Sequence, residues 1–330
     1  MSSDRDAAVR ELTAARRVRA PELLPWLFAI ALYFFLPQYL QLGTQILEMI
    51  LFTLSLDLLI GYTGIVTLGH AAYYGAGAYT AGLIAVAGWS EPLTGLLAAT
   101  VTAGLLGLVT GAVILRTSGL ALLMLGMAVT LLLGELANNL NSITGGADGL
   151  QGVSIAPIFG VFRFDMFGHT AFLYALCVLL CACAFTRQLV IGPFGRSLFG
   201  IRQNPRRMEA IGVSVWRRKL AVFTISASLA GLAGGLSCQT NQFVTLEVFS
   251  FELSGTVILM LILGGTGRLY GAFVGATVYM LAQDTLAKQD PVLWQFWLGI
   301  FVIALVLFAR GGALGLVDTV SHLLRRRKLA

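Results

Sequence analysis

The sequence predicts an all-α protein, a polytopic bundle of about ten transmembrane helices with both termini in the cytoplasm. Hydrophobic residues make up 57% of the 330-residue chain and charged residues only 12%, far from the composition of soluble domains. Apolar runs of about 20 residues, long enough to cross a bilayer as helices, recur along almost the whole chain. The mean hydropathy of +0.84 agrees with this class.

Hydropathy assigns residues 25–309 to the membrane domain, flanked by basic cytoplasmic tails at residues 1–24 and 310–330. The expected spans are residues 25–42, 44–62, 70–88, 93–115, 118–138, 169–187, 220–238, 250–267, 269–284 and 293–309. The GGTGRLYG segment between the eighth and ninth spans predicts a tight inner turn.

The basic residues test this span count. Of the 22 lysines and arginines, 20 fall in segments that ten spans would place inside, and only Arg163 and Lys288 fall outside. An odd error in the count would scatter these charges over both faces. The net charge of +6 therefore indicates membrane topology and not nucleic-acid binding. The same topology places loop 188–219 in the cytoplasm and loop 139–168 outside.

A glycine-rich stretch, GYTGIVTLGHAAYYGAGAYTAGL (61–83), stands out because it weakens a membrane helix. Its first part predicts a helix break, which membranes tolerate only where protein or a water-filled cavity satisfies the freed backbone groups. Its second part carries two stripes of small residues, which allow helices to approach closely: Ala71, Gly75, Ala78 and Gly82, then Gly77, Ala81 and Ala85. Packing alone and a translocation pathway both fit these features. His70 fits a structural hydrogen-bonding role better than a metal or proton site.

Loop 188–219 contains a helix-start signal, Asn204 followed by Pro205, and a helix-stop signal at Gly212. These signals predict a helix of about two turns outside the membrane. Met208 and Ile211 share one face of it, which suits docking into a groove of a partner protein. Attachment to anionic lipid headgroups through its arginines fits equally well.

At the other face, Glu135, Asn138 and Asn139 share one side of a helix end. This polar lip either receives a hydrophilic solute or is simply solvated. Glu48 and Asp57 fall near opposite ends of the second span, where we expect each to reach polar surroundings, so they do not predict a paired acid site.

Catalytic motifs are missing from the sequence. It contains no phosphate-binding loop with its lysine, no zinc-protease motif and no nucleophile elbow, and its four cysteines lie in or beside apolar runs. We therefore predict that the chain is not an enzyme, has no catalytic or metal-binding residues and holds no cofactor itself.

Three segments resemble the permease subunits of ABC importers for branched-chain amino acids, in particular the LivM-type member of the LivH/LivM pair. They are residues 61–83, TGGADGLQGV (144–153) and IRQNPRRMEAIGVSVWRRKLAVFTISASLAGLAGG (201–235), and GGTGRLYGAFVGA (264–276) is a weaker fourth match. Together they span most of the chain from residue 60 to residue 276.

The resemblance implies a bacterial inner-membrane subunit with four kinds of partner. These are a homologous LivH-like permease, two cytoplasmic ATPases of the LivG/LivF type that bind ATP and Mg²⁺, a periplasmic binding protein and the lipid bilayer. It also implies that the 205–212 helix is a coupling helix, and its expected ATPase-coupling residues are Arg202, Asn204, Glu209, Ala210 and Gly212. At Pro205, Arg206 and Arg207 the sequence departs from the family pattern.

We therefore expect half of a gated pore that imports branched-chain amino acids or related small polar solutes. The expected pathway residues are Thr67, Gly69, His70, Tyr74, Gly75, Gly77, Glu135 and Asn138. The alternative is an ion-coupled secondary transporter, which would need an intramembrane proton or ion relay. Relatives of this architecture carry amino acids, urea or short amides, and the sequence does not choose among them.

Overall fold

A computed structural model describes residues 24–157, 162 and 168–308 of the chain. The two predicted tails lie outside the described residues, apart from Leu24, and so does Arg163. The described part is helical, and an isolated β-bridge pairs Leu150 with Val244. The all-α prediction is thus confirmed.

A helix occupies the position of every expected span in the described part of the chain. These helices are α2 (Leu24–Phe35), α3 (Leu40–Thr63), α4 (Ala71–Val86), α5 (Pro92–Ile114), α6 (Leu120–Asn139), α8 (His169–Ile191), α11 (Val215–Asn241), α12 (Phe251–Gly264), α13 (Gly271–Gln289) and α14 (Trp294–Phe308). Short elements connect them: η2 (Pro37–Tyr39), α7 (Asn141–Thr144), η3 (Gly146–Asp148), α9 (Pro193–Gln203), α10 (Pro205–Ala210) and η4 (Leu246–Phe249).

Five of the described helices, α3, α5, α6, α8 and α11, are long and apolar enough to cross a membrane. Helix α12 has 14 residues, which at 1.5 Å per residue is roughly 21 Å and shorter than a bilayer core of about 30 Å. The chain is therefore a multi-pass membrane protein. Ten complete crossings and cytoplasmic termini stay predictions.

The first helix boundary differs from the expected one. The sequence placed it at residue 43, whereas α2 ends at Phe35 and α3 begins at Leu40. Pro37 explains the difference, because proline has no N–H to donate and disfavours helical backbone at the preceding residue. Leu36 accordingly has φ −133° and ψ 60°.

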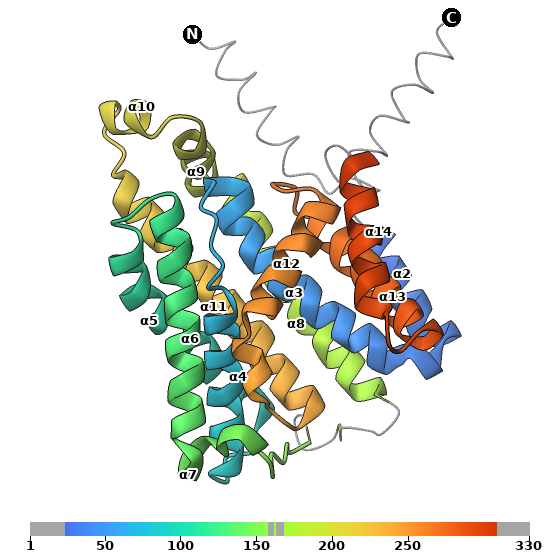
Figure 1. Cartoon of the computed structure of the whole chain (residues 1–330). Helices are drawn as coiled ribbons and strands as arrows, with labels where there is room; N and C mark the ends of the chain where they lie inside the picture. The colour runs from blue at the N-terminus through green and yellow to red at the C-terminus, as the bar shows by residue number, and fades with distance from the viewer. Residues whose placement is uncertain (1–23, 158–161, 163–167, 309–330) are drawn as a thin grey trace, which may run out of the picture.

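Helix α3 forms the centre of the bundle. In the most apolar stretch of α3, 78% is buried inside the bundle, whereas the share in α6, at the periphery, is 22%. It runs obliquely between a group containing α4, α5, α6 and α11 and a group containing α2, α13 and α14 (Figure 1).

Helix α11 packs on α4 and α5 by backbone contact. A Cβ atom added at Gly231 would lie 2.1 Å from the Cβ of Ala103 in α5 and 2.8 Å from the carbonyl oxygen of Ala99. One added at Gly234 would overlap the carbonyl oxygen of Tyr74 in α4. Such approaches let van der Waals contact drive helix association in lipid, where apolar burial contributes little.

The two ends of the bundle are distinct. Helices α9 and α10 lie at the end where α3 finishes, and α7 lies at the opposite end (Figure 1). The turn between α12 and α13 is at the α9 end, because Gly267 N donates to Asp57 in the last two turns of α3. The expected tight turn in the GGTGRLYG segment is confirmed.

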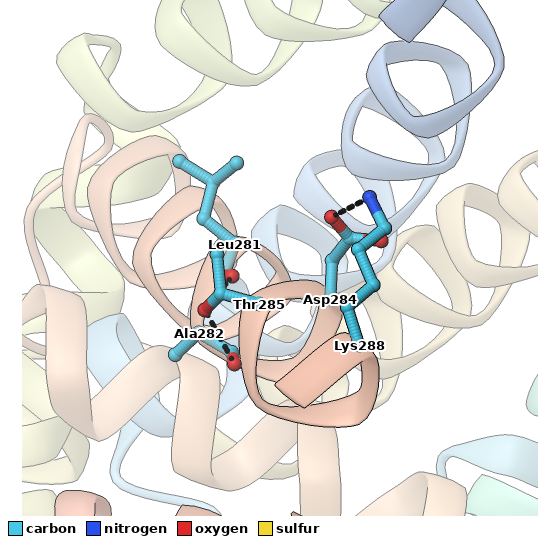
Figure 2. A network of polar contacts seen from close by, with 5 residues as sticks. All are labelled: Leu281, Ala282, Asp284, Thr285 and Lys288. Atoms are coloured by element: carbon cyan, nitrogen blue, oxygen red, sulfur yellow. Dashed lines mark hydrogen bonds and ion pairs between the residues drawn. The ribbon is translucent and has the colours of Figure 1, made fainter. Parts of the chain in front are cut away.

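Lys288 is at the far end of α13, away from that turn. Its ammonium group lies 2.6 Å from Asp284 Oδ2, and Figure 2 shows this ion pair on the outside of the helix. The Lys288 Nζ atom also lies 5.5 Å from the centre of the Tyr39 ring. The predicted topology places Lys288 on the external side of the membrane, and there its charge is paired with that of Asp284.

Candidate functional site

The polar loop 188–219 folds into two short helices at one end of the bundle. Helix α9 begins at Pro193, a residue suited to the first helical position, and buries Gly195, Leu198 and Ile201. The sequence analysis missed α9, although the i, i+4, i+7 spacing of Phe194, Leu198 and Ile201 is a helical signal. Helix α9 anchors the segment that follows it.

Helix α10 is the short helix predicted in loop 188–219, and its boundaries are confirmed. The Asn204 side chain accepts a hydrogen bond of 3.1 Å from Arg207 N, which makes it the N-cap. Gly212 has φ +86° just after the C-cap residue Ile211, as a helix-terminating glycine should. Ala210 is the last helical residue, and both it and Glu209 are exposed.

Met208 in α10 and its C-cap residue Ile211 do not form a shared docking face as expected. Ile211 is 72% exposed, but Met208 packs against α9, where a Cβ atom at Gly200 would lie 2.6 Å from its sulfur. Met208 therefore joins α10 to α9, and only Ile211 is left for an outside surface.

Arg202, at the end of α9, reaches the membrane helices. Its Nη1 atom donates to the carbonyl oxygen of Gly61, in the last turn of α3. The last four carbonyl groups of a helix have no intrahelical partner, and a cation there also interacts favourably with the helix dipole. Arg202 thus connects α9 to α3.

The expected helix break is confirmed at residues 64–70, between α3 and α4. Gly64 has φ +73° and ends α3, and Ile65 N donates back to Leu59 O. Gly69 touches the backbone of α6, where an added Cβ atom would overlap the carbonyl oxygen of Gly126. The buried Thr67 hydroxyl accepts from Gly69 N and so satisfies one freed backbone group.

His70 and Tyr74 lie deep among α3, α4 and α11. His70 is fully buried, its Nε2 atom lies 2.8 Å from Ser55 Oγ, and its ring stacks on Phe52. The Tyr74 ring lies 4.6 Å from the Phe52 ring, centre to centre. These contacts agree with the structural role preferred for His70.

Both small-residue stripes of α4 are packing surfaces within this chain. A Cβ atom at Gly75 would lie 2.4 Å from the ring of Phe249 in η4, and one at Gly77 would overlap the Gly231 carbonyl in α11. The expectation that this helix packs closely on more than one side is confirmed.

The outer lip lies at the end of α6. Asn139 donates 2.8 Å to Glu135 Oε1, both residues are exposed, and Asn138 is half-buried. The following loop is held by the bridge between Leu150 and Val244, just beyond α11. Glu135 and Asn138 lie in the last two turns of α6, whereas the 64–70 break contacts α6 at Gly126, near its other end.

A family model described as "Branched-chain amino acid transport system / permease component" matches residues 38–310, most of the chain. The chain belongs to this family. It is a permease subunit of an ABC importer, as the resemblance predicted, and such subunits are not enzymes themselves.

Curated relatives agree with the family assignment of the permease. It is 27% identical over 294 residues to LivM, a high-affinity branched-chain amino acid transport permease of Salmonella typhimurium, with 81% of this chain and 68% of the relative covered. It is 32% identical over 146 residues to LsrC, an autoinducer 2 import permease of Klebsiella pneumoniae, with 42% and 40% covered. No solved structure matches the permease significantly.

The two acidic residues of α3 are not where the sequence suggested. Glu48 and Asp57 are 2% and 1% exposed, so neither reaches polar solvent. Each instead has a specific donor: Thr240 Oγ1 lies 2.6 Å from Glu48 Oε1, and Gly267 N lies 2.7 Å from Asp57 Oδ1. A charged residue inside an apolar run was the available signal for such sites.

Proposed function

We propose that this permease forms half of the translocation pathway of an importer for branched-chain amino acids or related small polar solutes. It pairs with a LivH-like permease, docks two LivG/LivF-like ATPases and receives solute from a periplasmic binding protein. Its location is the inner membrane of a bacterium. The assembly is general to this family of permeases, and the substrate class rests on the family description and the LivM relatives.

One observation carries the docking part of this proposal, namely the pair of short helices that projects from one end of the bundle. Helix α10 is capped at both ends and fixed to α9 through Met208, so it is preorganised before any partner binds. Its free surface carries Ile211 and charged residues, a mixture that suits a protein groove. Arg202, Asn204, Glu209, Ala210 and Gly212 are the coupling residues in this proposal.

The pathway part concerns the break before α4 and the outer lip. Backbone groups freed at residues 64–70 are the kind that transporters use near solute sites. Thr67, Gly69, His70 and Tyr74 are proposed to shape the pathway from this break, with Glu135 and Asn138 at the outer mouth. Gly75 and Gly77 contribute by letting α4 pack against η4 and α11.

Reconstitution of the complete importer tests the proposal. The permease is co-expressed with a second permease and ATP-binding subunits from the same genome, and proteoliposomes are supplied with the binding protein and radiolabelled leucine. We expect leucine uptake that needs enclosed ATP and survives an uncoupler. Uptake driven by an ion gradient without ATP would instead establish the secondary transporter. ATP-dependent uptake of xylose or fructose, but not leucine, would refute the substrate class.

A further inference from the structure

Three segments meet at the α9 end of the bundle: the end of α9, the last two turns of α3 and the turn between α12 and α13. Arg202 Nη1 donates to Gly61 O, and Gly267 N donates to Asp57 Oδ1 at 2.7 Å. We propose that Arg202, Asp57 and Gly267 form a coupling node that carries movement of α9–α10 to the break before α4.

The backbone packing at this node is close enough to transmit displacement. A Cβ atom at Gly61 would lie 2.5 Å from Gly267 N, so the turn lies directly on the helix. A Cβ atom at Gly267, where φ is +77°, would lie 3.1 Å from Gly61 O and 3.3 Å from Arg202 Nη1. Backbones in such close contact cannot move independently of each other, because close-packed protein interiors transmit displacement.

The input to the node is α10. Met208 holds α10 against Gly200 in α9, and only Asn204 separates the two helices. Arg202 follows Ile201, whose side chain is buried against the bundle. A force applied to α10 by a partner therefore reaches the Arg202 guanidinium over a short stretch of chain.

The output is the break at residues 64–70. Gly64 directly follows the end of α3, and its position lies beside the Arg202 side chain, with 3.4 Å between an added Cβ atom and Arg202 Cγ. A second connection meets the other side of the break, since Ala71 N at the start of α4 donates 3.0 Å to Ser254 Oγ in α12. Ser254 is in the first turn of α12, and the other end of that helix leads into the turn that Asp57 holds. The node itself therefore touches the α3 flank of the break, and α12 links the node to the α4 flank.

Burying Asp57 has an energetic cost that packing alone does not explain. It is 1% exposed, and its Oδ2 atom has no hydrogen-bond partner among the described residues. Burying a charged group that is only partly satisfied is unfavourable, and ionisable residues at membrane depth usually serve function. A coupling role for the Asp57 carboxyl group gives this burial a function.

The inference rests on the proposed function, and reconstituted proteoliposomes can test it. Leucine uptake and ATP hydrolysis are measured on the same samples for the unmodified importer and for Arg202→Gln, Arg202→Lys and Asp57→Asn. Asparagine keeps an oxygen for Gly267 N but loses the charge, and lysine keeps the charge but loses the guanidinium fork. Arg196→Gln is the matched control, because Arg196 is exposed on the same helix.

We expect Arg202→Gln and Asp57→Asn to lower uptake per ATP hydrolysed by about tenfold, with hydrolysis and subunit co-purification within about twofold. Arg202→Lys should fall between Arg202→Gln and the unmodified importer, and Arg196→Gln should match the latter. An unchanged ratio of uptake to hydrolysis in Arg202→Gln would overturn the coupling node. Lack of uptake by the unmodified importer would instead refute the proposed function.

A labelling measurement separates transmission from a merely structural effect. Val66, within the break, is 45% exposed, and a cysteine there can report movement after the four native cysteines are replaced by alanine. We expect ATP to change the labelling rate of Val66→Cys by several-fold, and Arg202→Gln to abolish this change. An ATP-dependent change that persists in Arg202→Gln would contradict the coupling node, even if uptake falls.

Discussion

Gly77 lies where α4 crosses α11, and its replacement by alanine tests whether this crossing depends on backbone contact. An added Cβ atom would lie 2.2 Å from the carbonyl oxygen of Gly231 and 2.5 Å from its Cα atom. Ordinary contacts begin near 3.4 Å, so the helices would have to separate by about 1 Å. Both obstructing atoms belong to the backbone, which cannot rotate aside as a side chain can.

The energetic consequence can be worked from this geometry. Overpacking costs about 1–3 kcal/mol, and more where backbones must separate, which also weakens the dispersion contacts along the crossing. The opposing gain from placing alanine in a helix is about 0.5–1 kcal/mol. We therefore expect Gly77→Ala to destabilise the bundle by about 2–3 kcal/mol.

The assay is thermal unfolding of the purified permease in detergent, followed by the loss of monodisperse protein on gel filtration. At about 2 °C per kcal/mol, Gly77→Ala should lower the midpoint by about 5 °C. Gly255→Ala in α12 is the matched control, because no heavy atom lies within 4 Å of its added Cβ, and its midpoint should stay or rise slightly. Equal midpoints for the two variants would refute the close crossing of α4 and α11.

Three further predictions follow from single contacts. Asn204→Ala removes the N-cap of α10 and should weaken co-purification of the ATPases, at a helix cost of about 1 kcal/mol, whereas Asn204→Asp, which keeps a cap, should not. Gln239→Leu removes bonds of 2.8 Å to the Tyr174 hydroxyl and 2.7 Å to Pro92 O, and should lower the unfolding midpoint by an amount equivalent to about 1–3 kcal/mol; an unchanged midpoint would show that these bonds add nothing. Thr240→Val removes one hydrogen-bond donor to the buried Glu48 carboxyl group and should destabilise similarly. Pairing it with Glu48→Gln should restore much of the loss because no carboxylate is then left buried with fewer donors, and additive losses would contradict this.

Much of the candidate site could be predicted because its signals are local. Asn204, Pro205 and Gly212 mark the ends of α10 through side-chain capping and backbone φ, which depend only on neighbouring residues. Gly64 and Gly69 likewise marked the break. Helix α9 was missed because Pro193, Gly195 and Gly200 are residues typical of loops and weaken the helical signal of its apolar residues.

The partners of these residues could not be predicted. Asp57 meets Gly267 across 210 residues of sequence, and Arg202 meets Gly61 across 141. In each pair the partner is a backbone atom, Gly267 N or Gly61 O, and almost every residue has these groups, so the residue type at the partner position does not reveal the contact.

By itself the sequence determined that this protein is a bundle of membrane helices, where they lie along the chain, and where a helix breaks or is capped, because hydropathy and capping are short-range properties. Only the tertiary structure decided which faces meet, such as Gly77 on Gly231 and Arg202 on Gly61. In lipid an apolar face gains little by choosing one apolar neighbour over another. The choice is therefore made by close backbone fit and a few buried polar contacts, which exist only once the helices are assembled.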